Sequence, residues 1–222
     1  MARPKKPEER NRIRDVAFNV FTSKGFENSS FSDIAKEASV SKSLVQYYFP
    51  KKEQFINDFI DRSLSVVTQI VSDDLDYEFQ HELGKLYAVG YAQFYFAMYN
   101  DKMNSLRMDI IRDRAVTETV VRNGIEWIAS HTNAIPIDTP EAEEECRKTL
   151  VYVVGGAFDY IYGCLSQGVD IDPAFLSDTS MTLLSKFLPV EFTEGDAIRN
   201  AMTYDWLEKS RKKYNRMVFT VK

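Results

Sequence analysis

The feature that most constrains the fold of this 222-residue chain is the spacing of its apolar residues, which is helical almost throughout. In the N-terminal part, Ile13, Val16, Ala17, Val20 and Phe21 recur at positions i, i+3, i+4, i+7 and i+8, which is the pattern of one face of an amphipathic helix. No stretch alternates apolar with polar residues as a half-buried strand would. The sequence therefore predicts an all-α fold.

Turn-forming residues divide the chain into helices. Gly25 follows the polar end of the first helix, where a C-cap glycine is expected. Pro50 is expected to open a long helix that ends near Asp73, because proline suits a first helical position. The segment from Leu83 to Tyr99 is apolar nearly all round, which predicts a helix buried on most sides. Further helices are expected at about 102–112, 114–131, 141–168, 173–188 and 195–217.

Two short helices between the first and the long helix form the most informative motif. Ser30 followed by Asp33 predicts a capping box that starts a helix over Phe31–Ala38. After the break Ser39-Val40-Ser41, Ser41 can cap a second short helix that ends at Tyr48. Two short helices joined by such a tight turn indicate a helix-turn-helix.

The two faces of this motif differ in chemistry. Ile34 and Ala35 point inward from the first short helix, and Val40 fills the turn. Either Leu44 or Val45, together with Phe49, packs the second helix against the first. The outward positions of the second helix carry hydrogen-bonding and aromatic groups suited to base edges and phosphates. These outward residues are Lys42, Ser43, Gln46 and Tyr47.

The distribution of charge agrees with a nucleic-acid-binding N-terminus. Residues 1–56 carry eleven Lys and Arg and seven Asp and Glu, a balance of +4, whereas the rest carries seventeen and twenty-six, a balance of −9, which together give the net −5. A basic N-terminal part on an acidic protein suggests a domain that binds a polyanion. Its basic arm includes Arg3, Lys5 and Lys6.

Other classes of protein are disfavoured. The N-terminus has no apolar signal segment, and the longest apolar stretch, Val151 to Leu165, is too short and too polar to span a bilayer, so we expect a cytoplasmic protein without a membrane partner. Cys146 and Cys164 lie eighteen residues apart on one expected helix, too far for a disulfide. His81 and His131 have no metal-type partner at i+3 or i+4, and no nucleophile–base set is visible, so we expect no metal, cofactor or catalytic residue.

The stretch from Ile13 to Phe55 resembles the N-terminal domain of TetR-type transcriptional regulators. The agreement lies in Ala17 and Phe21, Gly25-Phe26, Ser30, Ile34-Ala35, Ala38-Ser39-Val40-Ser41, Tyr48-Phe49 and Lys52-Glu53. The resemblance covers about one-fifth of the chain, and the remainder agrees with the family only in length and helicity. It divides the chain into a DNA-binding domain over residues 8–56 and a helical ligand-binding and dimerisation domain over residues 57–222.

The resemblance also assigns residues to DNA contact. They are Ser30, Ser32, Lys42, Ser43, Tyr47 and Tyr48, with Lys52 holding a phosphate. Tyr48 is equally well explained as a core residue.

Two positions depart from the family pattern. Ser39 replaces the usual turn glycine, which is tolerable if the backbone there is not strongly left-handed. Gln46 replaces a tyrosine that touches phosphate, and glutamine can instead pair with adenine in the major groove.

For the C-terminal domain, the resemblance implies a homodimer that packs through segments 141–168 and 173–188 and binds a palindromic DNA site, the operator. The implied function is a repressor released from that operator by a small hydrophobic or amphipathic effector. Phe175, Leu176, Leu183, Leu184 and Phe187 would supply the apolar face of the second segment. Gly155 and Gly156, costly within a helix, fit a close dimer seam, a ligand contact or a simple kink.

An effector pocket is expected beside the buried helix 83–99. Tyr87, Tyr91, Phe94 and Met98 fall at i, i+4, i+7 and i+11 on one helix face, and Trp127 is expected to join them. Ordinary core packing explains each of these aromatics equally well. If Asp159 is buried, its carboxylate needs a partner, which could be a cationic ligand, a core Tyr or Arg, or simply solvent.

Two other functions compete with the regulator. One is an all-helical enzyme. The other is a helical adaptor or small-molecule-binding protein without DNA readout, which would use the basic segment Lys209–Arg216 on a membrane or nucleic-acid surface.

Overall fold

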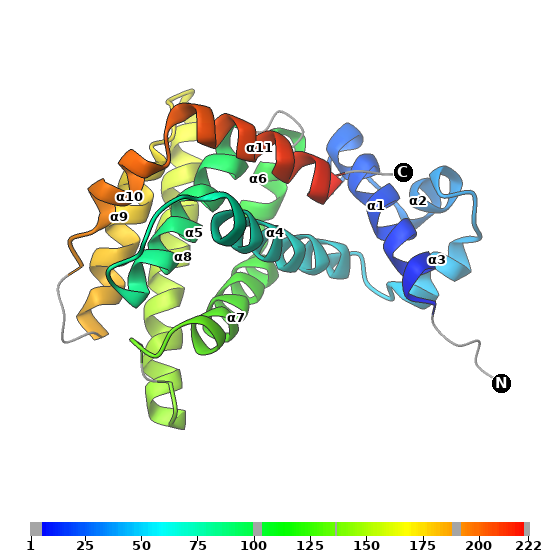
Figure 1. Ribbon diagram of the computed structural model, residues 1–222. Helices are drawn as coiled ribbons and strands as arrows, with labels where there is room; N and C mark the ends of the chain where they lie inside the picture. Colours follow the sequence, from blue (N-terminus) through cyan, green and yellow to red (C-terminus); the bar gives the residue numbers. More distant parts are fainter. Residues whose placement is uncertain (1–5, 100–103, 136, 188–191, 220–222) are drawn as a thin grey trace.

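The computed structural model describes residues 6–99, 104–135, 137–187 and 192–219, and within these ranges every regular element is a helix (Figure 1). The all-α prediction is therefore confirmed. Arg3 and Lys5 of the predicted basic arm lie outside the described residues. The helices are α1 (Pro7–Lys24), α2 (Phe31–Glu37), α3 (Lys42–Tyr48), α4 (Glu53–Asp74), α5 (Glu82–Met98), α6 (Asn104–Arg112), α7 (Arg114–His131), α8 (Pro140–Gln167), α9 (Pro173–Leu184), a 3₁₀ turn η2 (Ser185–Phe187), α10 (Gly195–Ala201) and α11 (Tyr204–Phe219).

Helices α1, α2 and α3 form a small N-terminal domain around an aromatic core. Phe21 meets both Phe26 and Phe55 edge to face, with ring centroids 5.1 and 5.7 Å apart. Phe49 stacks on Phe55 at 3.9 Å. Such pairs stabilise a fold by about 0.5–1.5 kcal/mol each beyond the apolar area that they bury. The N-terminal domain therefore depends on rings from α1, from the end of α3 and from the start of α4.

Helix α4 belongs to both domains. It begins at Glu53 and not at Pro50, because Lys51 and Lys52 form a turn before it, so the predicted start was wrong. Its early apolar residues, Phe55, Ile56 and Phe59, are buried against the N-terminal domain, and its later ones, from Val66 to Val71, are buried in the C-terminal domain. The predicted domain boundary at residue 56 therefore falls inside one continuous helix.

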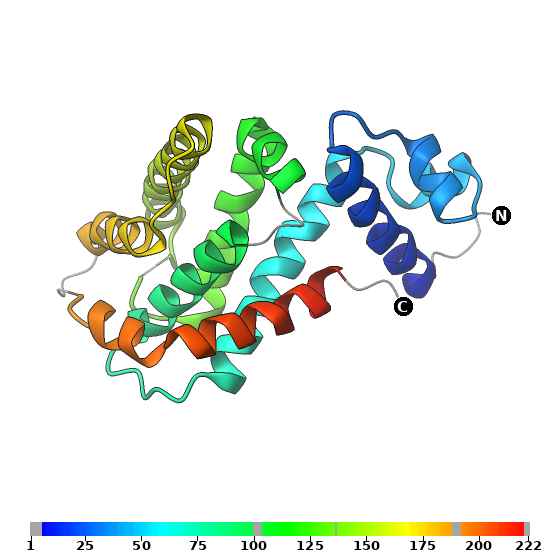
Figure 2. The same ribbon diagram turned by 90° about the horizontal axis from the view of Figure 1, so that it is seen from above.

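The C-terminal domain is built around α5. No residue from Leu83 to Met98 is exposed, as predicted for a helix buried on most sides. Helices α4, α9, α10 and α11 all contact it, while α7 and α8 pack together beside α4 and α9 (Figures 1 and 2). Gly168, in the left-handed conformation with φ 67°, ends α8, and its amide donates to the carbonyl of Cys164.

The last predicted helix, 195–217, is wrong as a single element. The chain leaves helical geometry at Met202, whose ψ is 62°, and α11 starts after Thr203, whose hydroxyl accepts the amide of Trp206 at 3.3 Å. A threonine that caps a new helix competes with continuation of the old one. The short α10 and the long α11 can therefore run in different directions.

Helix α11 returns to the N-terminal domain (Figure 2). Phe219 is buried with its ring 5.7 Å from that of Phe59 on α4, and Phe59 in turn meets Phe18 of α1 at 5.3 Å. The guanidinium of Arg62 on α4 donates to the carbonyl of Met217. The end of α11 thus lies at the junction of α1 and α4.

Candidate nucleic-acid interface and ligand site

The helix-turn-helix is set up by two serine caps. The Ser30 hydroxyl accepts the amide of Asp33 at 3.2 Å, while the Asp33 carboxylate accepts the amide of Ser30 at 2.9 Å, so the predicted capping box is confirmed. Lys24 adds an ion pair to Asp33 at 2.6 Å, and these hydrogen bonds and this charge hold the pKa of the Asp33 carboxyl well below its ordinary value. Ser41 caps α3 by accepting the amide of Leu44 at 3.2 Å, also as predicted.

The turn between α2 and α3 is a Schellman motif. The amide of Val40 donates to the carbonyl of Ala35 at 2.9 Å, and the amide of Ser39 donates to that of Lys36 at 3.2 Å. This 6→1 and 5→2 pairing places a left-handed residue just after the helix. That residue is Ser39, with φ 52°, the one non-glycine with positive φ among the described residues. The backbone at Ser39 is therefore left-handed, so the condition under which serine replaces the glycine without strain is not met.

The outward face of α3 carries the predicted polar residues. Lys42, Ser43 and Gln46 are exposed and Tyr47 is half-buried. Ser30 and Ser32 are exposed at the start of α2, on the same helix-turn-helix unit. These residues form a surface of donors and acceptors, and their contacts with DNA remain predictions.

Tyr48 does not belong to this surface. Its side chain is only 5% exposed, and its hydroxyl accepts the backbone amide of Lys6 at 3.1 Å. Its ring lies edge to face with that of Tyr47, 5.2 Å away. The described start of the N-terminal arm therefore covers Tyr48, which acts as a core residue that anchors the arm, and its assignment to DNA contact is corrected.

The side chain of Lys52 forms hydrogen bonds within the protein. Its ammonium donates to the carbonyls of Phe26 at 2.8 Å and Ser29 at 3.1 Å, and it lies 4.3 Å from the centroid of the Phe26 ring. An ammonium has three donors, so these two bonds leave one N–H for a phosphate. Lys52 thus fastens the segment before α2 to the start of α4.

A residue that the sequence did not single out binds the same segment from the other domain. The carboxylate of Asp109 on α6 accepts the amide of Phe26 at 2.8 Å. This contact joins the C-terminal domain to the residues that precede α2. No local pattern marks it, because the two residues are 83 positions apart in sequence.

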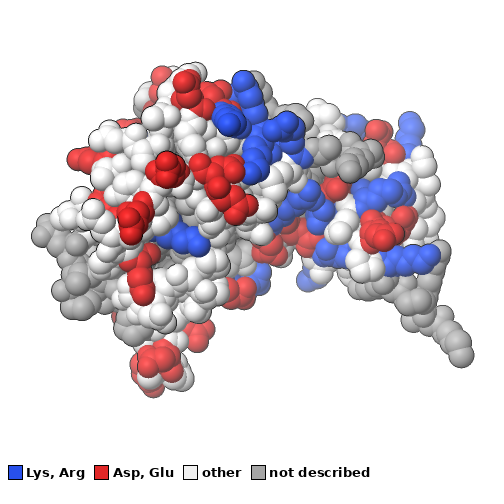
Figure 3. Space-filling model, viewed as in Figure 1, with Lys and Arg blue, Asp and Glu red and all other residues white. Residues whose placement is uncertain are grey.

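Charge is unevenly distributed over the molecule. On the face that Figure 3 shows, Lys and Arg gather over the N-terminal domain and along α11, whereas Asp and Glu dominate the remaining surface of the C-terminal domain. The basic side chains of α11 include Lys209 and Lys212, which are exposed. The predicted contrast between a basic N-terminal part and an acidic remainder is thus visible on this face. Helix α11 adds further basic side chains to the basic region.

The predicted effector residues on α5 have different surroundings. Tyr87 is 1% exposed and donates to Asp178 of α9 at 2.8 Å, and its burial raises the pKa of the phenol. Phe94 and Met98, farther along α5, pack instead against the apolar cluster between α8 and α9. Tyr91 is half-buried, with its ring 6.4 Å from that of Tyr87. Tyr87 therefore belongs to the main apolar core, whereas Phe94 and Met98 pack on the smaller cluster, and a pocket that they share stays a prediction.

Asp159 and Trp127 lie on other helices. Asp159 is exposed on α8, so the burial that would have demanded a partner is absent. Trp127 on α7 is 7% exposed and donates its indole N–H to the hydroxyl of Thr68 on α4 at 2.8 Å. Trp127 therefore packs on the α4 side of the domain.

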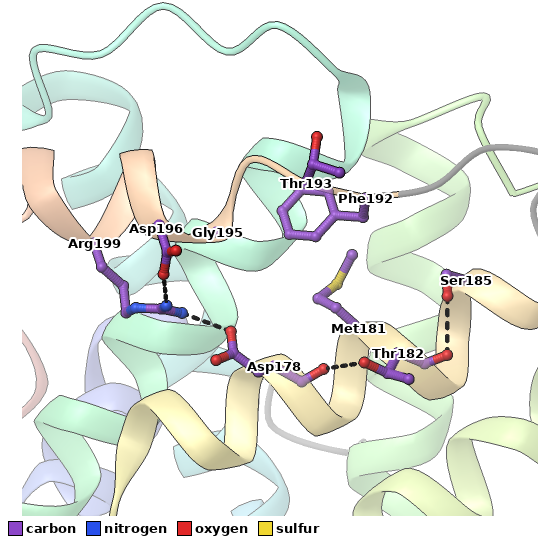
Figure 4. A pocket seen from close by; sticks show the side chains of 9 residues that line it. All are labelled: Asp178, Met181, Thr182, Ser185, Phe192, Thr193, Gly195, Asp196 and Arg199. Carbon is purple, nitrogen blue, oxygen red and sulfur yellow. Dashed lines mark hydrogen bonds and ion pairs between the residues drawn. The ribbon is translucent and has the colours of Figure 1, made fainter.

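One cavity, of about 360 Å³, lies between α9 and the start of α10, and we call it the α9–α10 cavity (Figure 4). Arg199 pairs there with Asp178 at 2.6 Å and with Asp196, and it contacts the Tyr87 hydroxyl. Phe192 and Met181 give the cavity an apolar side. Its two carboxylates therefore already have a guanidinium partner within the protein.

A second cavity, of about 300 Å³, opens between α4 and α7, and we call it the α4–α7 groove. Of the predicted effector residues, only Trp127 lines either of these two cavities. The groove is lined by Asp61, Leu64, Ser65, Thr68, Asn123, Glu126, Trp127, Ser130 and His131.

Helix α8 presents a stripe of an aromatic residue, glycines and one carboxylate that its own chain leaves largely uncovered. Tyr152 is 78% exposed, and Gly156, Asp159 and Gly163 follow it at helical spacing on the same side. Phe175 of α9 is 49% exposed. Length and composition alone would allow α8 to cross a membrane, a test that core helices of soluble proteins also pass. Leu176 and Leu184, predicted on the free face of α9, are instead buried in their own chain, and nothing is described of the Phe187 side chain.

Comparisons with known proteins agree with this geometry. Residues 13–59 match the family model described as bacterial regulatory proteins, tetR family. Among solved structures, the chain is similar to the multidrug binding protein EbrR complexed with imidazole, with a TM-score of 0.50 and 19% identity over 85% of this chain and 94% of that one. It also matches the TetR family protein CprB from S. coelicolor A3(2), with a TM-score of 0.38 and 16% identity over 93% of this chain and 99% of that one. A comparison with curated proteins gives no match.

Proposed function

We propose, from the premise that residues 13–59 form a helix-turn-helix domain of the tetR family of bacterial regulatory proteins, that this chain is a transcriptional repressor controlled by a small effector. The observation that carries the proposal is the capped α2–turn–α3 unit, whose second helix exposes Lys42, Ser43 and Gln46. A helix-turn-helix places its second helix in the major groove, where such side chains reach base edges. DNA recognition is therefore the function of the N-terminal domain.

The regulator acts as a homodimer that packs through α8 and α9. A Cβ added at Gly155, Gly156 or Gly163 would meet nothing within 4 Å. Each glycine costs roughly 1 kcal/mol against alanine within a helix, and packing within the chain gives no reason for that cost. Close approach of a second copy gives one, since the exposed Tyr152 lies on the same stripe. The two recognition helices then lie about 34–36 Å apart, which matches successive major grooves on one side of a duplex.

Control by an effector requires a path between the two domains. Helix α4 runs through both of them, and Asp109 of α6 binds the segment that precedes α2. An effector that prefers one arrangement of these contacts would change operator affinity. A coupling free energy of about 1–3 kcal/mol corresponds to a change of about 5–150-fold. Release of the operator by the effector is the direction that we propose.

Selection of binding sites from random duplexes tests the DNA-binding function directly. We expect enrichment of a palindrome and an affinity that falls steeply with salt, because phosphate contacts release counterions. Gln46→Ala should relax the preference at one base pair and weaken binding to the selected site by about 1–3 kcal/mol. The matched control is Gln69→Ala, which changes an exposed glutamine on α4.

Failure to enrich any sequence would refute the proposal and favour an adaptor without DNA readout. Equal loss of affinity by Gln46→Ala for specific and random duplexes would show that Gln46 contacts the DNA backbone. A monomer of 25.6 kDa in light scattering at micromolar concentration would refute the dimer.

A further inference from the structure

The α4–α7 groove has walls of unequal chemistry. Leu64 of α4 and the indole of Trp127 give it apolar surface, and the two carboxylates of Asp61 and Glu126 are among its other lining groups. At about 300 Å³, the groove is large enough for a small organic molecule. It opens on the outer side of α4, since Asp61 and Ser65 are exposed.

The charges of the groove are not balanced within the protein. Its lining includes two carboxylates and neither lysine nor arginine. The Asp61 carboxylate accepts the side-chain amide of Asn123, which is neutral. Although the residue as a whole is exposed, partial desolvation of its carboxylate raises the pKa of Asp61. The Asn123 hydrogen bond and the charge of Arg122 lower this pKa, and the charges of Asp58 and Glu126 raise it.

Arg122 pairs with Glu126 but does not line the groove. Arg122 lies 4.0 Å from the Glu126 carboxylate, and both side chains are more than half exposed. Such an exposed pair is screened by solvent. Among the described residues, Asp61 forms no ion pair, and Arg122 opposes its charge only without direct contact.

The aromatic wall is held in place before any ligand arrives. The Trp127 indole N–H donates to Thr68 at 2.8 Å. Its ring stacks on the imidazole of His131 with centroids 4.3 Å apart and planes 4° apart. Tryptophan is the aromatic side chain that attracts cations most strongly. A fixed indole beside an unbalanced carboxylate is the arrangement that recognises an organic cation.

We propose that the α4–α7 groove binds a small organic cation, with its positive charge between Asp61 and Glu126 and its apolar part against Trp127 and Leu64. The α9–α10 cavity differs because Arg199 already balances its carboxylates. The proposal that the groove binds such a cation does not depend on the proposed DNA-binding function. The use of the groove as an effector site rests on the proposed function, and the position of the groove on α4 supports that use. One turn before Asp61, Asp58 pairs with Arg10 of α1 at 2.6 Å.

Fluorescence of Trp127 provides the test. The chain has two tryptophans, so Trp206→Phe leaves Trp127 as the only one. This variant would be titrated with benzyltrimethylammonium and with N-benzylacetamide, an uncharged molecule with the same ring and the same number of heavy atoms. We expect the fluorescence of Trp127 to change and then saturate as the cation is added. The cation should bind at least about fivefold more tightly than the amide, because only the cation is attracted by the carboxylates and by the indole ring.

Asp61→Asn in the same background should weaken binding of the cation by about fivefold and leave the amide unchanged. Its fold should be retained, because the raised pKa means that ionised Asp61 is disfavoured in the folded state. A thermal melt therefore checks that lost binding is not unfolding. The matched control is Asp73→Asn, which removes an exposed carboxylate three turns farther along α4 and should change neither affinity.

Equal affinity for the cation and the amide, or an unchanged cation affinity in Asp61→Asn, would overturn the proposal. The outcome is separate from that of the DNA experiment, which is performed without any ligand. If the cation binds and operator affinity does not respond, the site stands and its effector role is refuted.

Discussion

Replacement of Ser39 by glycine should stabilise the protein. Ser39 occupies the left-handed position of the Schellman motif, with φ 52°, and its side chain is exposed. The motif depends on the amides of Ser39 and Val40, which donate to Lys36 and Ala35. Ser39→Gly therefore relieves the backbone while every described hydrogen bond of the motif is retained.

The size of the gain follows from two opposing effects. A non-glycine residue in the left-handed region costs about 1–2 kcal/mol. Glycine loses more conformational freedom on folding, which costs about 0.5–1 kcal/mol. The serine hydroxyl at this position has no hydrogen bond described to the rest of the protein, so its removal subtracts little. A net gain of about 0.5–1 kcal/mol is expected from these terms.

Urea unfolding measures this change as a higher midpoint at an unchanged slope. Ser39→Ala serves as the matched control, because it removes the same hydroxyl and keeps the Cβ that conflicts with positive φ. It should be no more stable than the parent. Equal effects of glycine and alanine would show that the hydroxyl matters and the backbone does not, and a destabilised Ser39→Gly would refute the reasoning.

Three further changes test other contacts. Gly84→Ala should lower stability by about 1–3 kcal/mol, because the new Cβ would lie 2.5 Å from a buried Glu194 oxygen and 2.9 Å from the Phe79 ring; an unchanged melting temperature would contradict this. Lys52→Met should cost about 1–2 kcal/mol in urea unfolding, because it removes the Lys52 donor from the Ser29 carbonyl and leaves the Phe26 carbonyl with only the Ser29 amide. It should also reduce the salt slope of DNA binding by roughly 1 if the third N–H holds a phosphate. Asp109→Ala should cost about 1–2 kcal/mol by removing the acceptor of the Phe26 amide, and effector-dependent changes in operator affinity should shrink with it; full retention of both would exclude Asp109 as a link between the domains.

Local chemistry explains which parts of the fold could be predicted from the sequence. Ser30 and Ser41 were recognised as caps because their partners lie three residues away. The outward position of Gln46 follows from helical periodicity alone. The break at Thr203 was missed because a threonine inside a helical pattern is compatible with both continuation and a new start. Ser39 shows the reverse case, since the surrounding hydrogen bonds impose a backbone that the residue does not prefer.

Contacts between distant segments explain what could not be predicted at the site. Tyr48 lies at a position whose role depends on whether the N-terminal arm covers it, and the amide of Lys6 is 42 residues away. The partners of Lys52 are carbonyls 23 and 26 residues earlier. Tyr87 and Met98 share a helix face but belong to different apolar clusters, because α5 is surrounded by other helices. Periodicity identifies a face, and only the tertiary fold identifies what each end of it meets.

The contacts between the two domains are of a kind that suits a switch. Three carboxylates take part in the polar ones: Asp58 with Arg10 at 2.6 Å, Asp15 with Arg62 at 3.0 Å, and Asp109 with the amide of Phe26 at 2.8 Å. The two partly exposed ion pairs contribute about 0–1 kcal/mol each, and the hydrogen bond of Asp109 contributes about 1–2 kcal/mol. Their sum is comparable with the 1–3 kcal/mol by which effectors commonly shift an equilibrium.

The apolar contact behaves differently. Phe59 and Phe219 are buried at the junction of α1, α4 and α11, and burial of apolar surface is not weakened by moderate salt as ion pairs are. The aromatic junction can therefore keep the domains together while the polar contacts set their relative orientation. A ligand in the α4–α7 groove would act one helical turn from the Asp58–Arg10 pair, which is among the contacts weak enough to be exchanged. Control of DNA binding in this chain then requires only that some polar contacts between the domains are exchanged, while the contact between Phe59 and Phe219 stays in place.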